Sequence, residues 1–165
     1  MRNHIVLAAT ALLVLGLSAP ARADIDLEGT LLLGTGVDTG KNPNNPYALQ
    51  LGGAGEVIIS GWVLGVRATR ALSSGDTPVG LDLRSFGGDF GFEWEILLLH
   101  LGPRFGGGRV SAKNGDWHSA YLEPGAVAEV EVGWFVAGVD VRYRIVTKDK
   151  DANGLLAYAK VGLRF

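Results

Sequence analysis

Histidine and serine are the residues of this sequence that could hydrolyse or transfer an acyl group. His118 and Ser119 are adjacent, so in an extended strand their side chains would point to opposite faces. Two residues of one strand must share a face if the imidazole of one is to activate the hydroxyl of the other. His100 has no serine two positions away and shares a predicted strand face with Arg104. We therefore interpret His100 as part of a polar network. Hydrolysis would require a serine or aspartate brought beside a histidine by the fold.

The stretch GTGVDTGK at 34–41 has some glycines of a phosphate-binding loop but not the full pattern. That motif requires glycine where Thr35 stands and a hydroxyl residue where Asn42 stands. Both requirements fail, so nucleotide binding is not predicted. No other stretch suggests a cofactor, and we predict none.

The stretch DKDANG at 149–154 begins like a calcium loop, in which alternate oxygens converge on the ion and glycine makes the turn. The twelfth position, which should supply a bidentate acid, is Lys160. We therefore interpret the stretch as a polar hairpin loop. The alternative is weak binding of a divalent ion by Asp149, Asp151 and Asn153.

The first 23 residues have the pattern of an export signal. Arg2 precedes an apolar run over 5–19, and ARA at 21–23 supplies the small residues that precede signal cleavage. A membrane-spanning helix needs about 20 apolar residues, so the run is short for an uncleaved anchor, which is the alternative. We expect a cleaved signal peptide over 1–23 and an exported domain over 24–165.

Composition limits the partners of the exported part. Without the signal, 13 basic and 17 acidic residues remain, a net charge of 13 − 17 = −4, and no basic patch suggests nucleic acid. The sequence has no cysteine, which excludes disulfides and a cysteine zinc site. Its 25 glycines recur through alternating segments, which favours short strands and tight turns.

Alternation of apolar and polar residues with a period of two recurs along the rest of the sequence, and no long stretch has a helical period. It predicts eight strands, over 25–37, 47–59, 62–70, 79–90, 95–105, 120–132, 135–146 and 155–165. Long polar connectors alternate with short ones, which is typical of outer-membrane barrels. The fold class predicted is therefore all-β, an eight-stranded antiparallel up-and-down transmembrane β-barrel.

Two-residue turns at 133–134 and 60–61 set the register of the strands that they join. They predict these opposite pairs: Glu123 with Arg144, Val130 with Ala137, and Val57 with Leu64. Extension to the last strand predicts two more pairs, Asp140 with Lys160 and Phe135 with Phe165. Opposite charges that meet across strands stabilise such a register.

The fourth strand breaks the alternation. If Leu83 faces outward and Arg84 inward, Asp89 falls on the apolar face. A bulge at Gly87-Gly88 would correct this, because glycine tolerates bulges. The turn that follows is predicted near GFEW at 91–94.

Alternation alone does not decide which face is outside, because a lipocalin-like barrel would turn its apolar face inward. The polar face mixes matched charges with glycines, which suits the narrow interior of a small barrel. Its charged residues are Glu56, Arg67, Asp82, Arg84, Arg104, Glu123, Glu129, Glu131, Asp140, Arg142, Arg144, Lys160 and Arg164. The apolar face carries aromatics near strand ends, as in the girdles of membrane barrels. These aromatics are Tyr47, Trp62, Phe105, Phe135 and Tyr143.

The last strand, LLAYAKVGLRF at 155–165, carries a resemblance. With its alternation and final aromatic residue it resembles the small eight-stranded outer-membrane β-barrel family, the outer-membrane protein A-like and X-like barrels. The resemblance implies insertion by the outer-membrane assembly machinery, with Val161, Leu163 and Phe165 as the recognised signal. It also implies the outer membrane of a Gram-negative bacterium as the location, with outer-membrane lipid and lipopolysaccharide as partners.

The resemblance does not imply one activity, because such barrels serve as anchors, adhesins, narrow porin-like pores or enzymes. We predict a non-enzymatic, monomeric barrel with a structural or surface-interaction role. Its four outer loops, above all 106–119 with Trp117 exposed, would make any specific contact. The alternatives are a lipid A-modifying enzyme and a soluble periplasmic lipocalin-like binder. The binder would require an inward-facing set of Leu49, Leu51, Val130, Ala137, Val139 and Val161.

Overall fold

The computed structural model describes residues 25–39, 45–72, 83–112, 117–148 and 152–165. The predicted signal peptide over 1–23 lies outside the described residues, as do Asp82, Asp149 and Asp151.

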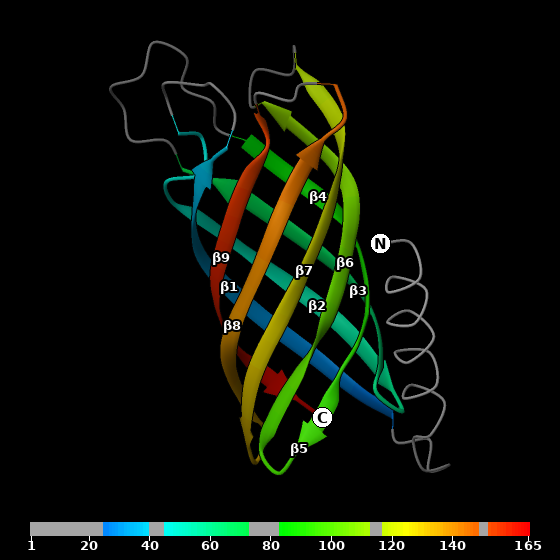
Figure 1. Ribbon diagram of the computed structural model, residues 1–165. Coiled ribbons are helices and arrows are strands. Elements are labelled where there is room, and N and C mark those ends of the chain that lie inside the picture. Colours follow the sequence, from blue (N-terminus) through cyan, green and yellow to red (C-terminus); the bar gives the residue numbers. More distant parts are fainter. Residues whose placement is uncertain (1–24, 40–44, 73–82, 113–116, 149–151) are drawn as a thin grey trace, which may run out of the picture.

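The described chain forms a closed antiparallel barrel (Figure 1). Its strands are β1 (Ile25–Asp38), β2 (Gln50–Ile59), β3 (Trp62–Ala71), β4 (Leu83–Phe92), β5 (Trp94–Ile96), β6 (Leu99–Ala112), β7 (His118–Val132), β8 (Phe135–Val146) and β9 (Gly154–Arg164). β4 and β5 pair with β6 in one continuous register, so the nine segments make eight barrel strands. Pairing of β1 with β9 and of β4 with β6 closes the sheet. The predicted all-β, up-and-down barrel is confirmed.

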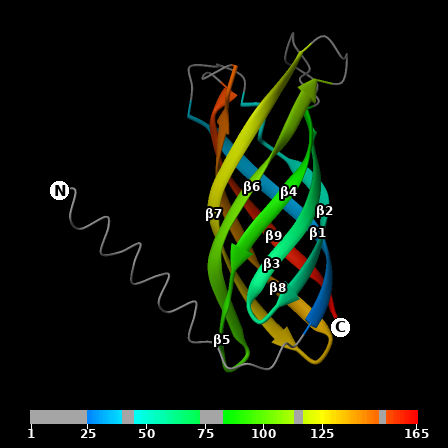
Figure 2. The same cartoon turned by 90° about the vertical axis from the view of Figure 1, so that its right-hand side faces the viewer.

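The connections divide the barrel into two ends (Figures 1 and 2). Two-residue turns at 60–61, 97–98 and 133–134 join strands at one end, which we call the turn end. Strands β1, β3, β6 and β8 end at the other end of the barrel, which we call the loop end. Both positions of the first turn have positive φ, 51° at Ser60 and 84° at Gly61, as a tight hairpin turn requires.

The turn predicted near 91–94 is wrong, because the chain turns at Leu97-Leu98. The glycine and polar residues of GFEW belong to a strand whose ladder is interrupted at Glu93. In the same register Gly102 stands opposite Glu93, and the neighbouring Pro103, which has no N–H to donate, stands opposite Phe92. Glu93 turns its carboxylate into the barrel, where it is buried. The polar residue that suggested a turn therefore serves the interior.

The register of two hairpins agrees with the predictions, with Val130 opposite Ala137 and Val57 opposite Leu64. The predicted register of β8 with β9 is wrong by two residues. Lys160 stands opposite Gly138, and Asp140 opposite Tyr158. Phe165 exchanges backbone hydrogen bonds with Leu27 of β1, not with Phe135. A shift of two keeps every side chain on its predicted face and changes only its partners.

Strand β4 has no bulge, since its pairing with β3 runs without interruption through Gly87-Gly88. Leu83 points into the barrel and Arg84 points outward, so the predicted interior position of Arg84 is wrong. Asp89, which is buried between two arginines, decides which residues of β4 point into the barrel. A buried carboxylate with charged partners fixes the strand more firmly than the side of one leucine.

The distribution of side chains is inverted relative to a water-soluble domain. Leu31 of β1 is 75% exposed, whereas its neighbour Leu32 is 2% exposed and lies inside. Arginine, lysine and glutamate fill most of the interior. The set that a lipocalin-like binder needs inward faces outward instead: Leu49, Leu51, Val130, Ala137, Val139 and Val161. None of the described residues forms a helix long and apolar enough to cross a membrane.

Candidate functional site in the barrel interior

The interior side chains form three regions between the turn end and the loop end. The turn-side cluster consists of Glu28, Glu56, Glu93, His100, Arg104, Glu129, Glu131, Lys160 and Arg164. The central layer consists of Arg67, Asp89, Asp140 and Arg142. The apolar cap consists of Leu32, Tyr47, Ala71, Leu83, Val110, Tyr121, Val146, Ala152, Leu156 and Tyr158.

The central layer balances two cations against two anions, and each arginine contacts both aspartates. Arg67 Nε lies 3.0 Å from Asp89 Oδ2, and Arg67 also donates to Asp140. Arg142 lies 2.9 Å from Asp89 Oδ1 through Nη1 and 2.6 Å from Asp140 Oδ1 through Nε. The four residues come from β3, β4 and β8, so this ring ties together strands that are far apart in the sheet.

The turn-side cluster is organised around two cations of β9. Lys160 Nζ lies 2.6 Å from Glu28, 2.5 Å from Glu129 and 3.2 Å from Glu56. The predicted pair of Lys160 with Asp140 is therefore wrong. Gly138 stands opposite Lys160, and a Cβ at Gly138 would collide with Glu129. The glycine lets the Glu129 side chain lie flat against β8 within reach of Lys160.

Arg164 is the second cation of the turn-side cluster. Its Nη2 lies 2.5 Å from Glu28 Oε2 and 3.1 Å from Glu129 Oε2, and its Nη1 lies 3.0 Å from Glu93 Oε1. Arg104 adds a third cation, 2.7 Å from Glu93. The cluster thus holds five carboxylates against three permanent cations.

His100 lies in this cluster, as its interpretation as part of a polar network requires. Its Nε2 lies 3.3 Å from Glu131, its Nδ1 lies 3.5 Å from Glu93, and Arg164 Nη1 lies 3.1 Å from Nδ1. Glu131 is only half-buried at the turn end. Within the described residues these contacts are all with charged groups and none is with a serine.

The predicted pair of Glu123 and Arg144 is present above the central layer, with Arg144 Nε 2.5 Å from Glu123 Oε1. Arg144 Nη2 also donates to Ser85 Oγ at 3.1 Å. The guanidinium lies over the ring of Tyr121, 4.7 Å from its centroid, and 5.6 Å from that of Tyr47. Cation–π contact of this kind joins the charged interior to the apolar cap.

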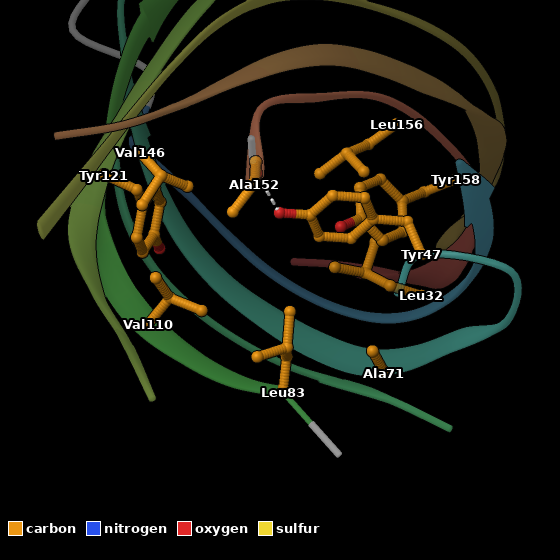
Figure 3. Close-up of a cluster of buried hydrophobic side chains, with 10 residues drawn as sticks. All are labelled: Leu32, Tyr47, Ala71, Leu83, Val110, Tyr121, Val146, Ala152, Leu156 and Tyr158. Atoms are coloured by element: carbon orange, nitrogen blue, oxygen red, sulfur yellow. Dashed lines mark hydrogen bonds between the residues drawn. The ribbon is translucent and has the colours of Figure 1, made fainter. Parts of the chain in front are cut away.

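Tyr47 is the centre of the apolar cap and not a girdle residue, so that prediction is wrong. Its side chain is 0% exposed, and its hydroxyl donates to the Ala152 carbonyl at 2.5 Å (Figure 3). Burial raises the pKa of the Tyr47 phenol, which keeps this donor protonated. The ring fits because position 154 is glycine, where a Cβ would collide with the ring, and a Cβ at Gly36 would collide with the Tyr47 Cβ.

A local turn directs Tyr47 inward. The Tyr47 N–H donates to Asn45 Oδ1 at 3.1 Å, and Asn45 Nδ2 donates to the Gly36 carbonyl at 2.6 Å. Beneath this turn, the Tyr158 hydroxyl donates to Gln50 Oε1 at 2.9 Å. Figure 3 shows the rings of Tyr47 and Tyr158 beside Leu156 and Leu32. The cap therefore fills the interior toward the loop end.

The remaining predicted girdle aromatics lie on the outer face and are exposed: Trp62, Phe105, Phe135 and Tyr143. Trp62 stacks on Phe90, with ring centroids 5.5 Å apart. The predicted assembly residues Val161, Leu163 and Phe165 also face outward.

The sequence did not predict two interior charges, Glu28 and Glu93, and it placed Asp89 inside only through a bulge that β4 does not have. Glu28 shares its face with Thr30 and Gly34, a polar and small-residue alternation that could have revealed it. Glu93 gave no such signal, because it sits where the strand is interrupted.

His118 and Ser119 behave as alternation predicts. His118 is exposed, whereas Ser119 is buried and its Oγ lies 3.3 Å from Thr147 Oγ1. The predicted outer loop over 106–119 is wrong, because β6 runs to Ala112 and β7 begins at His118. Trp117 is partly buried against the apolar cap and is not a free loop residue.

The hairpin interpretation of DKDANG gains one observation, since Asn153 Oδ1 accepts a hydrogen bond of 2.8 Å from the Val146 N–H. This amide therefore fixes the end of β8. Its oxygen is already used within the chain.

Solved structures share this fold. The N-terminal β-barrel domain of OprF from Pseudomonas aeruginosa matches with a TM-score of 0.62 and 14% identity, over 87% of this chain and 100% of that chain. Neisserial surface protein A (NspA) matches with a TM-score of 0.61 and 14% identity, over 85% of this chain and 95% of that chain. No protein-family model and no curated protein matches the sequence. The likeness shows the fold, which is that of the eight-stranded outer-membrane barrels.

Proposed function

We propose that the protein is a non-enzymatic outer-membrane β-barrel with a structural or surface-interaction role. The observation that carries this proposal is the inverted burial, with apolar side chains outside and charged ones inside. Only helices and closed barrels satisfy all backbone hydrogen bonds in hydrocarbon. The exposed apolar face then contacts lipid, and the barrel stands as a monomer.

A packed interior supports a scaffold rather than an open pore. Eight strands leave an interior that side chains can fill, and here ion pairs and the apolar cap occupy it along its length. Contacts with other molecules would then be made by the outer surface and the loop end. In planar bilayers we expect no stable conductance from the purified protein.

A lipid A-modifying activity has less support. The described contacts of His100 are with Glu93, Glu131 and Arg164, and His118 is exposed on a strand face opposite that of Ser119. A hydrolase needs a base beside its nucleophile, and among the described residues neither histidine has a hydroxyl nucleophile beside it.

Fractionation and lipid analysis test this function together. After expression in a Gram-negative host, we expect the protein in the outer-membrane fraction, resistant to extraction by urea. Mass spectrometry should show the same lipid A with and without the protein. Recovery in the soluble periplasm would contradict the membrane proposal, and a new lipid A species would contradict the non-enzymatic one.

We also propose that the outer-membrane assembly machinery recognises the final strand through Phe165. Phe165→Ala keeps the backbone bonds to Leu27, so any loss of insertion comes from the side chain. Phe135→Ala is a matched control, because the two rings are 64% and 67% exposed on neighbouring strands. We expect several-fold less inserted protein for Phe165→Ala only. Equal insertion of both variants would contradict this role.

A further inference from the structure

Three arginines stand out on the outer face of the barrel. Arg70, Arg84 and Arg109 are exposed, whereas the outward positions nearer the turn end of the same strands are apolar or small. They lie on β3, β4 and β6, which are neighbours in the sheet (Figure 2). Among the described strand residues, these are the exposed cations of the outer face. We call them the arginine patch.

The register concentrates their charge in a small area. Arg70 stands directly opposite Arg84. Arg109 stands opposite Phe86, one outward position below the Ser111 that faces Arg84. Residues directly opposite across strands have Cβ atoms about 4.5–5.5 Å apart. Arg70 already takes part in an interaction within the chain, so Arg84 and Arg109 carry the inference.

The patch lies at the loop end. Arg70 is next to the end of β3, Arg84 follows the first residue of β4, and Arg109 is near the end of β6. Arginine on a lipid-facing surface is costly at the middle of a bilayer and nearly free of cost at its edge. The side chains below on the same strands, Phe86, Val66 and Phe90, are apolar and exposed. The patch therefore marks the level where hydrocarbon gives way to headgroups.

An apolar groove runs beside the patch. It is shallow, and Leu51, Gly53 and Ala68 line it together with Arg70 and Arg84. Gly53 stands opposite Ala68, so two small residues side by side make the depression. A hydrocarbon chain in this groove would place its polar end at the guanidinium groups.

We propose that the arginine patch and its groove bind lipopolysaccharide, with a lipid A phosphate on Arg84 and Arg109 and an acyl chain over Gly53 and Ala68. Arginine pairs with phosphate through parallel N–H donors, which a lysine does not offer in the same geometry. This inference rests on the proposed function, because it places the loop end in the outer leaflet.

Binding of lipid A to the purified full-length protein in detergent micelles tests this site. The double variant Arg84→Gln/Arg109→Gln is compared with Lys148→Gln, which removes an exposed cation elsewhere at the loop end. We expect at least tenfold weaker binding of bisphosphorylated lipid A by the double variant and a change below twofold for Lys148→Gln. Matching circular dichroism spectra establish that all variants are folded.

Two further probes identify what is recognised. Dephosphorylated lipid A should bind the wild type at least tenfold more weakly than the bisphosphorylated form. Inorganic phosphate should compete only at concentrations far above those of lipid A, because it cannot use the groove. Equal binding by the double variant, or equal binding of both lipid A forms, would overturn the site. Competition by inorganic phosphate at lipid A concentrations would overturn the acyl groove.

Outer-membrane fractionation of the same variants separates this inference from the proposed function. Loss of lipid A binding with normal membrane insertion supports the site. Insertion together with unchanged binding overturns the site and leaves the proposed function intact. Recovery of the wild type in the periplasm overturns the function, whatever the micelle titration gives.

Discussion

The central layer and the turn-side cluster of the interior differ in how their buried charges are balanced. In the central layer, two arginines and two aspartates pair with one another and leave no excess charge. In the turn-side cluster, five carboxylates share three permanent cations and His100. Burying a charge without a partner is expensive, and the unbalanced cluster includes Glu131, whose side chain is 30% exposed at the turn end. Substitutions should therefore cost more stability in the central layer than in the turn-side cluster.

The largest effect is expected from breaking the balanced layer. Arg142→Met leaves Asp89 and Asp140 with Arg67 alone, and removal of one partner of a buried pair costs about 3–5 kcal/mol. Urea unfolding of the barrel in lipid vesicles, followed by tryptophan fluorescence, measures this loss. Arg84→Met is the control, because Arg84 faces outward, and it should change stability by less than about 1 kcal/mol. Equal effects of the two variants would contradict the proposed ring.

The apolar cap adds a second contrast, between a closed loop end and a charged lumen. Tyr47→Ala removes the ring that fills the space beside Gly154 and deletes the hydrogen bond to Ala152. Truncation of a buried aromatic costs about 3–5 kcal/mol. We also expect small ion conductance steps in planar bilayers that the wild type lacks. A silent variant with unchanged stability would show that the cap does not close the barrel.

The smallest effect is expected in the turn-side cluster. In Glu129→Gln, Lys160 keeps Glu28 and Glu56, so the free energy of unfolding should change by only about 1 kcal/mol at neutral pH. Asp140→Asn is the matched change in the central layer, where Arg67 and Arg142 would retain only Asp89. We expect that variant to lose about 3 kcal/mol. Similar losses in the same urea assay would remove the distinction between the regions.

The faces of most strands could be predicted from the sequence, because alternation is a local property of an extended chain. Lys160 and Arg164 point inward as predicted. Their partners could not be predicted, since a register shift of two preserves every face. Lys160 binds glutamates of β1, β2 and β7, and only closure of the barrel brings these carboxylates together.

The errors fall where alternation ends or conflicts with itself. Tyr47 precedes β2, so its direction depends on the turn held by Asn45 and not on strand parity. In β4, an outward Leu83 would have required an outward Asp89. The buried ion pairs of Asp89 hold this carboxylate inside, so Leu83 points inward as well. Arg84 consequently lies outside, where it forms part of the arginine patch.

In a membrane, we expect the apolar side chains to face lipid and the charged ones to face the interior. The sequence has no cysteine, so spin labels can be attached singly at Leu31→Cys and Leu32→Cys of the protein in lipid vesicles. Leu31 is 75% exposed and Leu32 is 2% exposed. The label at position 31 should collide with oxygen dissolved in lipid and not with a water-soluble nickel chelate, and the label at 32 should be reached by neither. Relaxation of the label at 31 by the nickel chelate would contradict the account.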